Sequence, residues 1–249
     1  MLLTSSLEKL GQYAILMRKV LTRPQKWRIF LQQLSKEISK LGVDSISIVI
    51  IISFFIGAVI VIQIALNINN PLLPRYTVGY TSREIILLEF SSSIMCLILA
   101  GKVGSNISSE IGTMRVTEQI DALEIMGVNS ANYLILPKVV GLMAFVPVLV
   151  VLSMFFGIVG GFGVCYFTNA VPVADFEYGL QSFFKTFYIW YAILKTIFFA
   201  FLISSIAAYY GYYAKGGSLD VGKASTNAVV VSSILILISD LLITDLMMG

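Results

Sequence analysis

The chain has 249 residues, of which 57% are hydrophobic and 12% are charged, and its formal net charge is +3. A mean hydropathy of +0.89 leaves too little polar surface for an ordinary soluble domain, so the composition indicates an integral membrane protein. The sequence has no histidine, the commonest metal ligand and general base, which argues against an enzyme. Cys96 and Cys165 lie in apolar runs typical of buried thiols, and we expect neither a disulfide nor a metal site.

Residues 1–45 contain no apolar core followed by a small-residue cleavage site, so they do not resemble a secretory signal. Thr22 and Pro24 predict a helix start. The apolar residues that follow recur at helical spacing among lysines and arginines: Trp27, Phe30, Leu31, Leu34, Ile38 and Leu41. This pattern favours an amphipathic interfacial helix in the inner headgroup layer, and packing against another subunit is the alternative.

Five apolar runs follow, and each is long enough to cross about 30 Å of hydrocarbon as a helix. We expect an all-α integral membrane protein in which residues 1–45 precede a five-span domain at 46–249. The third run contains Pro147, where a tilt or kink is expected. The expected spans are residues 46–66, 85–101, 139–167, 186–213 and 224–247.

Lysine and arginine are distributed unevenly among the segments that connect these spans. They are concentrated before the first span, in the loop at 102–138 and between the fourth and fifth spans, whereas the other connections contain only Arg75, Arg83 and Lys185. Because basic residues are retained on the cytoplasmic side, we expect a cytoplasmic amino terminus, a cytoplasmic loop 102–138 and a periplasmic carboxyl terminus.

Glu89, Lys195 and Asp240 are ionisable residues inside the expected spans. A charge in the bilayer interior costs a few kcal/mol unless it is paired or hydrated. We therefore expect Lys195 to pair with Glu89 or Asp240 beside a water-accessible cavity open to the outer face. A purely structural ion pair is the alternative, and a relay in an ion-gradient-driven secondary transporter is another.

Residues 110–127 form a charged, amphipathic island in this apolar chain. Val116, Ile120, Leu123 and Met126 fall on one face at helical spacing, and Gly127 then supplies a helix stop. The apolar face is expected to rest on the inner ends of the spans, which leaves the charged face for a soluble partner. A solvated connector between two spans is the alternative.

The island reads Glu-Ile-Gly-Thr-Met-Arg-Val-Thr-Glu-Gln-Ile-Asp-Ala-Leu-Glu-Ile-Met-Gly, which closely resembles the signature of the MlaE-type permeases. These are membrane subunits of lipid-transporting ABC systems, and the likeness runs from about residue 46 to the end. It implies that the helix around 116–126 is a coupling helix, docked in a separate nucleotide-binding subunit. The residues implied in ATPase coupling or in shaping its turns are Glu110, Gly112, Arg115, Glu118, Asp121, Glu124 and Gly127.

The resemblance also implies a homodimer that moves phospholipid between the inner membrane and an outer-side MCE-type carrier. The family often has an arginine before the intramembrane glutamate, whereas Leu88 precedes Glu89 here, so headgroup contact is expected to shift to Arg83 or Lys195. Residues 217–224 have the spacing of a phosphate-binding loop but carry Ala224 where Ser or Thr would bind magnesium. ATP and magnesium are therefore expected on the partner ATPase, and this chain is expected to have no cofactor, catalytic residue, metal site or nucleic acid partner. A non-transporting membrane anchor is a third interpretation.

Overall fold

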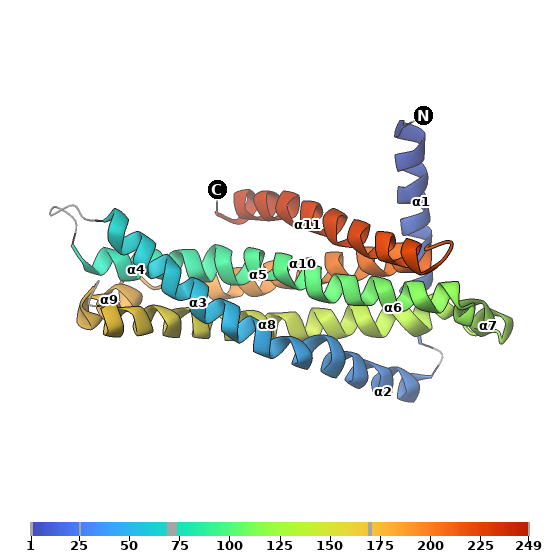
Figure 1. The fold of residues 1–249 in the computed structure, drawn as a ribbon, viewed down its shortest axis with the longest axis horizontal. Helices are drawn as coiled ribbons and strands as arrows, with labels where there is room; N and C mark the ends of the chain where they lie inside the picture. The colour runs from blue at the N-terminus through green and yellow to red at the C-terminus, as the bar shows by residue number, and fades with distance from the viewer. Residues whose placement is uncertain (1, 25, 69–73, 169–170, 249) are drawn as a thin grey trace. The chain divides into compact units, whose positions relative to one another are not determined.

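The computed structural model describes residues 2–24, 26–68, 74–168 and 171–248 (Figure 1). All regular structure in these ranges is helical, which confirms the all-α prediction. The chain divides into two compact units. The first unit contains Met1–Val43, Leu97–Phe145 and Phe198–Ser239, and the second contains Asp44–Cys96, Val146–Ile197 and Asp240–Gly249.

Five helices of the described chain are long and apolar enough to cross a membrane, which confirms a multi-pass membrane protein. Four of them extend beyond the predicted spans, because an apolar run marks only the part of a helix that suits lipid. The polar residues at their ends continue the helix. The five are Trp27–Asn67, Tyr76–Val116, Ser130–Thr168, Phe187–Tyr212 and Ser218–Met248.

The amino-terminal region contains a helix that the sequence analysis missed, α1 (Leu2–Val20). The predicted amphipathic helix is α2 (Trp27–Glu37), which starts at Trp27 and not at Thr22. The Thr22 hydroxyl instead donates to the Lys19 carbonyl at the end of α1, at 2.9 Å. A π-helical stretch, Ile38–Val43, then joins α2 to α3 (Asp44–Asn67), so the first span and the helix before it are one continuous element.

The prediction of a loop at 102–138 is wrong for most of these residues. The second spanning helix continues to Val116, and a short helix and the start of the third span contain most of the remaining residues. Two π-helical stretches, Ile86–Ile94 and Ala100–Gly104, lie within it, and such wider turns are frequent at functional sites. The helices are α4 (Tyr76–Ile85), α5 (Met95–Leu99), α6 (Ser105–Val116), α7 (Gln119–Ile125) and α8 (Ser130–Thr168).

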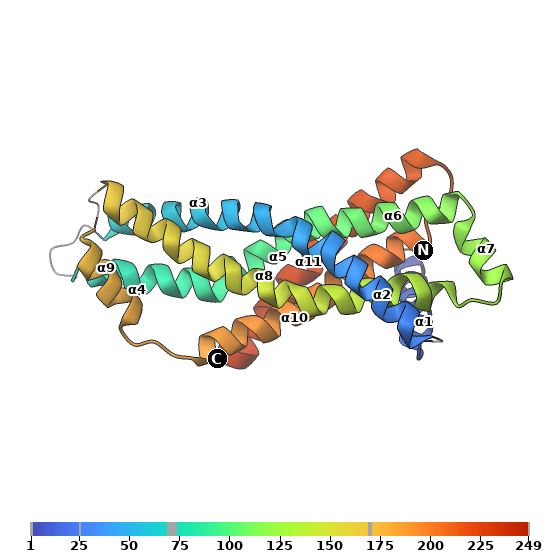
Figure 2. The same ribbon diagram turned by 90° about the horizontal axis from the view of Figure 1, so that it is seen from below.

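The last part of the chain forms α9 (Val173–Gln181), α10 (Phe187–Tyr212) and α11 (Ser218–Met248). Helix α9 lies beside α4 in the second unit, as Figure 2 shows. Their backbones approach closely at Gly79, where a methyl group would overlap the Phe176 carbonyl oxygen. A methyl group at Gly57 of α3 would likewise overlap the carbonyl of Gly157 in α8, so small residues allow both helix contacts.

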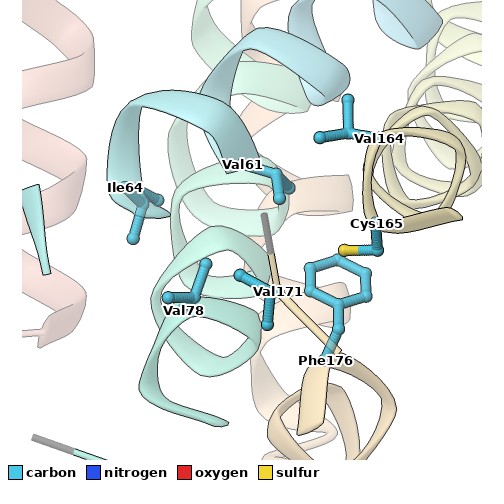
Figure 3. Packing of buried hydrophobic residues seen from close by; sticks show 7 residues of the cluster. All are labelled: Val61, Ile64, Val78, Val164, Cys165, Val171 and Phe176. Atoms are coloured by element: carbon cyan, nitrogen blue, oxygen red, sulfur yellow. The ribbon is translucent and has the colours of Figure 1, made fainter. Parts of the chain in front are cut away.

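A buried apolar cluster fills the second unit where α3, α4, α8 and α9 meet (Figure 3). The Cys165 thiol points toward the ring of Phe176, and Cys165 and Cys96 are both buried, as predicted. The members of the cluster are Val61, Ile64, Val78, Val164, Cys165, Val171 and Phe176.

Candidate functional site

A buried lysine lies between two carboxylates in the second unit. Lys195 of α10 has a side chain that is 0% exposed, and its ammonium pairs with Oδ1 of Asp240 in α11. Its Nζ also lies 3.5 Å from Oε1 of Glu89, in the π-helical stretch that precedes α5. The predicted pairing is confirmed, and Lys195 has both acids as partners. We call Glu89, Lys195 and Asp240 the Lys195 cluster.

Hydroxyl groups complete the hydrogen bonding of the Lys195 cluster. Lys195 Nζ donates to the Tyr191 hydroxyl at 3.2 Å and to Thr244 Oγ1 at 3.4 Å. On the acidic side, Ser93 Oγ lies 2.8 Å from Asp240 Oδ1 and 3.3 Å from Glu89 Oε2. Buried charges need such partners, because an unpaired ion in an apolar interior is strongly destabilising.

Helix geometry explains why these six side chains meet. Glu89 and Ser93, Tyr191 and Lys195, and Asp240 and Thr244 are each four residues apart, so each pair lies about one turn apart on its helix. Three helical segments thus contribute one charged group and one hydroxyl group each. This repeated spacing is visible in the sequence, but the predicted site contains only the charged members of the three pairs.

The exposure of the three charged residues differs. Asp240 is 17% exposed and Glu89 is 45% exposed, whereas Lys195 is closed off entirely. With all three groups ionised, the cluster carries one negative charge in excess. Lys195 therefore offers no surface to a phosphate group, contrary to expectation, and Glu89 is the accessible member.

Arg83 is also unavailable to a headgroup in this structure. Its side chain is buried in α4, and Nη1 donates to the carbonyls of Leu180 and Ser182 at 2.6 and 2.7 Å. Nη2 pairs with Glu84 at 2.7 Å. Because these bonds connect α4 to the end of α9, Arg83 holds the two helices together, and the expectation that it contacts lipid phosphate is not supported.

The predicted coupling helix at 116–126 is shorter than expected. Helix α6 ends at Val116, Glu118 adopts a left-handed conformation with φ of 59°, and α7 then runs from Gln119 to Ile125. Gly127, with φ of 77°, ends this segment as predicted. Gly112 does not shape a turn: it lies inside α6, where an added methyl group would approach Val221 to 3.0 Å.

Polar bonds connect α7 to three other helices of the first unit. Arg115 Nη1 of α6 donates to Asp121 Oδ1 at 2.5 Å across the turn. Glu124 accepts hydrogen bonds from Ser130 of α8 and Tyr212 of α10, both at 2.8 Å. These two hydroxyls lower the pKa of Glu124, because they favour its ionised form.

The apolar face of α7 is only partly covered. Ile120 is fully buried and Leu123 is half-buried, as the sequence predicts for a face resting on the spans. Met126 is 68% exposed, however, and Ile125 is 87% exposed. The end of α7 therefore presents two apolar side chains outward, at the turn between α6 and α8 that Figure 2 shows.

A second buried lysine, which is not among the predicted site residues, lies in the first unit. Lys138 of α8 is 3% exposed, and its Nζ donates at 2.7 Å to both Glu37 of α2 and Glu110 of α6. Lys40 also pairs with Glu110, at 3.0 Å. Glu110, expected to contact an ATPase, thus lies in an internal ion network, which we call the Lys138 cluster (Glu37, Lys40, Glu110 and Lys138).

These features define a helical membrane protein whose units each bury a lysine between carboxylates, with a short, partly exposed helix between two spans. The chain matches the family described as Permease MlaE over residues 34–246, and it belongs to that family. The resemblance recognised in the sequence is therefore confirmed.

Relatives from three lineages share this similarity and are named as probable ABC transporter permease proteins. The protein from Rickettsia bellii is 32% identical over 243 residues, which cover 96% of this chain and 92% of the relative. A Synechocystis relative is 31% identical and covers 85% of this chain and 80% of its own length. A relative from Pyropia yezoensis is 29% identical, with coverage of 92% and 87%.

Proposed function

We propose that this protein is the membrane subunit of an ABC transporter that moves phospholipid between the inner membrane and an outer-side MCE-type lipid carrier. The working assembly is a homodimer with a lipid cavity at the subunit interface. A separate cytoplasmic ATPase subunit binds ATP and magnesium. The distribution of lysine and arginine supports a cytoplasmic amino terminus and a periplasmic carboxyl terminus.

The observation that carries this proposal is the way α7 is held. Its polar side chains bond to α6, α8 and α10 of the first unit, whereas Ile125 and Met126 at its end remain exposed. An exposed apolar end on a braced segment suits insertion into a groove of a partner protein. A movement of that partner would then be passed to three helices through Arg115, Asp121 and Glu124.

In the lipid pathway we assign the substrate-facing role to Glu89, the accessible acid of the Lys195 cluster. Lys195 and Asp240 act as positioning residues that hold its carboxylate between α10 and α11. An ionisable group in a spanning helix lowers the stability of the protein in the membrane, and such groups therefore usually have a functional role. Closure of the ATPase dimer would change the cavity around Glu89 and so move lipid toward the outer carrier.

The partner contact is tested by replacing Ile125 and Met126 with Asp in the complete transporter and measuring how much ATPase subunit co-purifies. We expect about a tenfold or larger loss, since two charges would be buried at the contact. The matched control is Leu21→Asp, a similarly exposed leucine that follows α1 outside the spanning helices. Full recovery of the ATPase with the double variant would overturn the proposed coupling.

The transport step is tested with Glu89→Gln in proteoliposomes that contain the ATPase and the lipid carrier. We expect normal assembly but loss of ATP-dependent lipid transfer. Unchanged transfer would instead support a membrane anchor, and transfer driven by a pH gradient without ATPase would support a secondary transporter.

A further inference from the structure

We propose that the first unit contains an anion site, distinct from the transport path, that takes the phosphodiester headgroup of an anionic lipid in the adjoining leaflet. The site is an open pocket of about 310 Å³ formed by α1, the end of α10 and the start of α11. Its wall combines three lysines with three tyrosines, namely Lys9, Lys215, Lys223, Tyr209, Tyr210 and Tyr213.

Helix α1 is fixed against α10, which gives the pocket a defined wall. The Tyr13 hydroxyl donates to Ser205 Oγ at 2.9 Å, and the Tyr209 hydroxyl donates to Gln12 Oε1 at 3.3 Å. The buried side chains of α1 fall at helical spacing on the same face: Leu16, Met17 and Val20. Lys9 lies one turn before Tyr13, so it is on the face that α1 turns toward α10.

The charge of the pocket favours an anion. Asp220 is the single carboxylate among the described residues that line it, against three lysines. Asp220 already accepts from Lys223 at 3.1 Å and from the Gly217 amide at 3.3 Å. Glu8, which interacts electrostatically with Tyr209, adds a second carboxylate, so two acids stand against three lysines and the charge remains positive. The hydroxyls of Tyr210 and Tyr213 supply neutral donors.

Position favours a lipid over a soluble phosphate. The pocket lies where α10 ends and α11 begins, and tyrosine and lysine at the ends of spanning helices are typical of the level at which lipid headgroups lie. Exposed leucines neighbour its lining residues in the sequence, Leu7 and Leu10 near Lys9 and Leu219 beside Asp220, and they offer apolar surface to acyl chains. A soluble phosphate ion would have no use for this surface.

Part of the site lies outside the region shared with the family, since α1 supplies one wall of the pocket. The match to the permease family begins at residue 34, so Lys9 and Gln12 lie outside it. The pocket belongs to the first unit, whereas Glu89, Lys195 and Asp240 belong to the second. Failure of this inference would leave the transport proposal unaffected.

Native mass spectrometry of the purified full-length protein tests the proposal, with phosphatidylglycerol and phosphatidylcholine offered at equal concentrations. We expect preferential retention of phosphatidylglycerol, and about tenfold lower occupancy in the Lys9→Gln/Lys215→Gln variant, because each lysine near a lipid surface contributes to binding. The matched control is Arg18→Gln/Lys19→Gln, which removes two exposed cations of the same unit that do not line the pocket. Should the double variant not fold, Lys215→Gln alone is expected to lose roughly threefold.

Equal phosphatidylglycerol occupancy in the wild type and the Lys9/Lys215 variant would overturn the site, as would an equal loss in the control. A second arm adds millimolar inorganic phosphate or glycerol 3-phosphate. Persistence of bound phosphatidylglycerol supports a lipid ligand, whereas its displacement would assign the pocket to a soluble phosphate and overturn the lipid proposal.

Discussion

Both units pair a buried lysine with carboxylates, but the two clusters differ in how their charges are balanced. Each buries one lysine between two carboxylates that come from other helices: Lys195 between Glu89 and Asp240 in the second unit, and Lys138 between Glu37 and Glu110 in the first. In both cases the lysine joins three helical segments that are far apart in sequence. In both units a lysine with two anionic partners therefore connects helices to one another.

The difference lies in what balances the second carboxylate. In the Lys138 cluster a second cation, Lys40, contacts Glu110, so the charges are equal in number. The Lys195 cluster has hydroxyl groups of Ser93, Tyr191 and Thr244 in place of a second cation, and one negative charge remains in excess. The Lys138 cluster therefore has equal numbers of positive and negative charges and holds its helices together. The Lys195 cluster has, in addition, an exposed carboxylate that a transport mechanism can use.

Removal of Lys195 should have the largest effect. Lys195→Met leaves two carboxylates facing each other without their cation, and we expect the free energy of unfolding to fall by about 3–5 kcal/mol. Chemical or thermal unfolding of the detergent-purified protein measures this. The double variant Lys195→Met/Asp240→Asn should recover a large part of the lost stability. If Lys195→Met is as stable as the wild type, the cluster does not hold the helices together.

Replacement of Lys138 should be less damaging. Lys138→Met leaves Glu110 with Lys40 as a partner, so we expect a loss of about 2 kcal/mol, smaller than for Lys195→Met. The same unfolding measurement applies to both variants. If Lys138→Met is as destabilising as Lys195→Met, Lys40 does not compensate and the proposed contrast between the clusters fails.

The sequence predicted the class of fold and one cluster well, but not the other. Apolar runs located all five spans, and the cost of a charge in lipid singled out Glu89, Lys195 and Asp240. Lys138 carries the same signal, a lone lysine in a largely apolar stretch of α8. The sequence nevertheless predicts a loop residue at this position, because the uninterrupted apolar run begins at 139.

Other features could not be predicted because they depend on distant residues. Glu110 resembles an exposed residue of a charged island, and only the folded chain brings it to Lys138 of α8 and Lys40. The break between α6 and α7 depends on the left-handed conformation of Glu118, a residue type that does not signal such a turn. Helix α1 has a mixed polar and apolar sequence, and its stability comes from packing against α10.

Neutralising Glu89 should affect function far more than stability. Glu89→Gln removes the excess negative charge and keeps the shape of the side chain, so we expect stability to change by less than about 1 kcal/mol while lipid transfer is lost. Glu37→Gln in the Lys138 cluster is the matched variant, and it should lower stability more than it lowers transfer. Equal effects of the two variants on both measurements would remove the functional distinction between the clusters.

The smallest expected effect concerns Glu124, whose carboxylate is held by hydrogen bonds from two hydroxyl groups. Ser130 and Tyr212 lower its pKa, so its contribution to stability is complete above the ordinary pKa of a carboxyl group and is lost as the pH falls through the lowered value. The thermal midpoint of the wild type should therefore exceed that of Glu124→Gln near pH 7, and the difference should vanish in acid. Glu118→Gln, in the same exposed turn, controls for the loss of a surface charge, and its difference from the wild type should be small throughout. A difference for Glu124→Gln that persists unchanged at low pH would mean that the ionised carboxylate does not brace α7, and the proposed link from α7 to α8 and α10 would then fail.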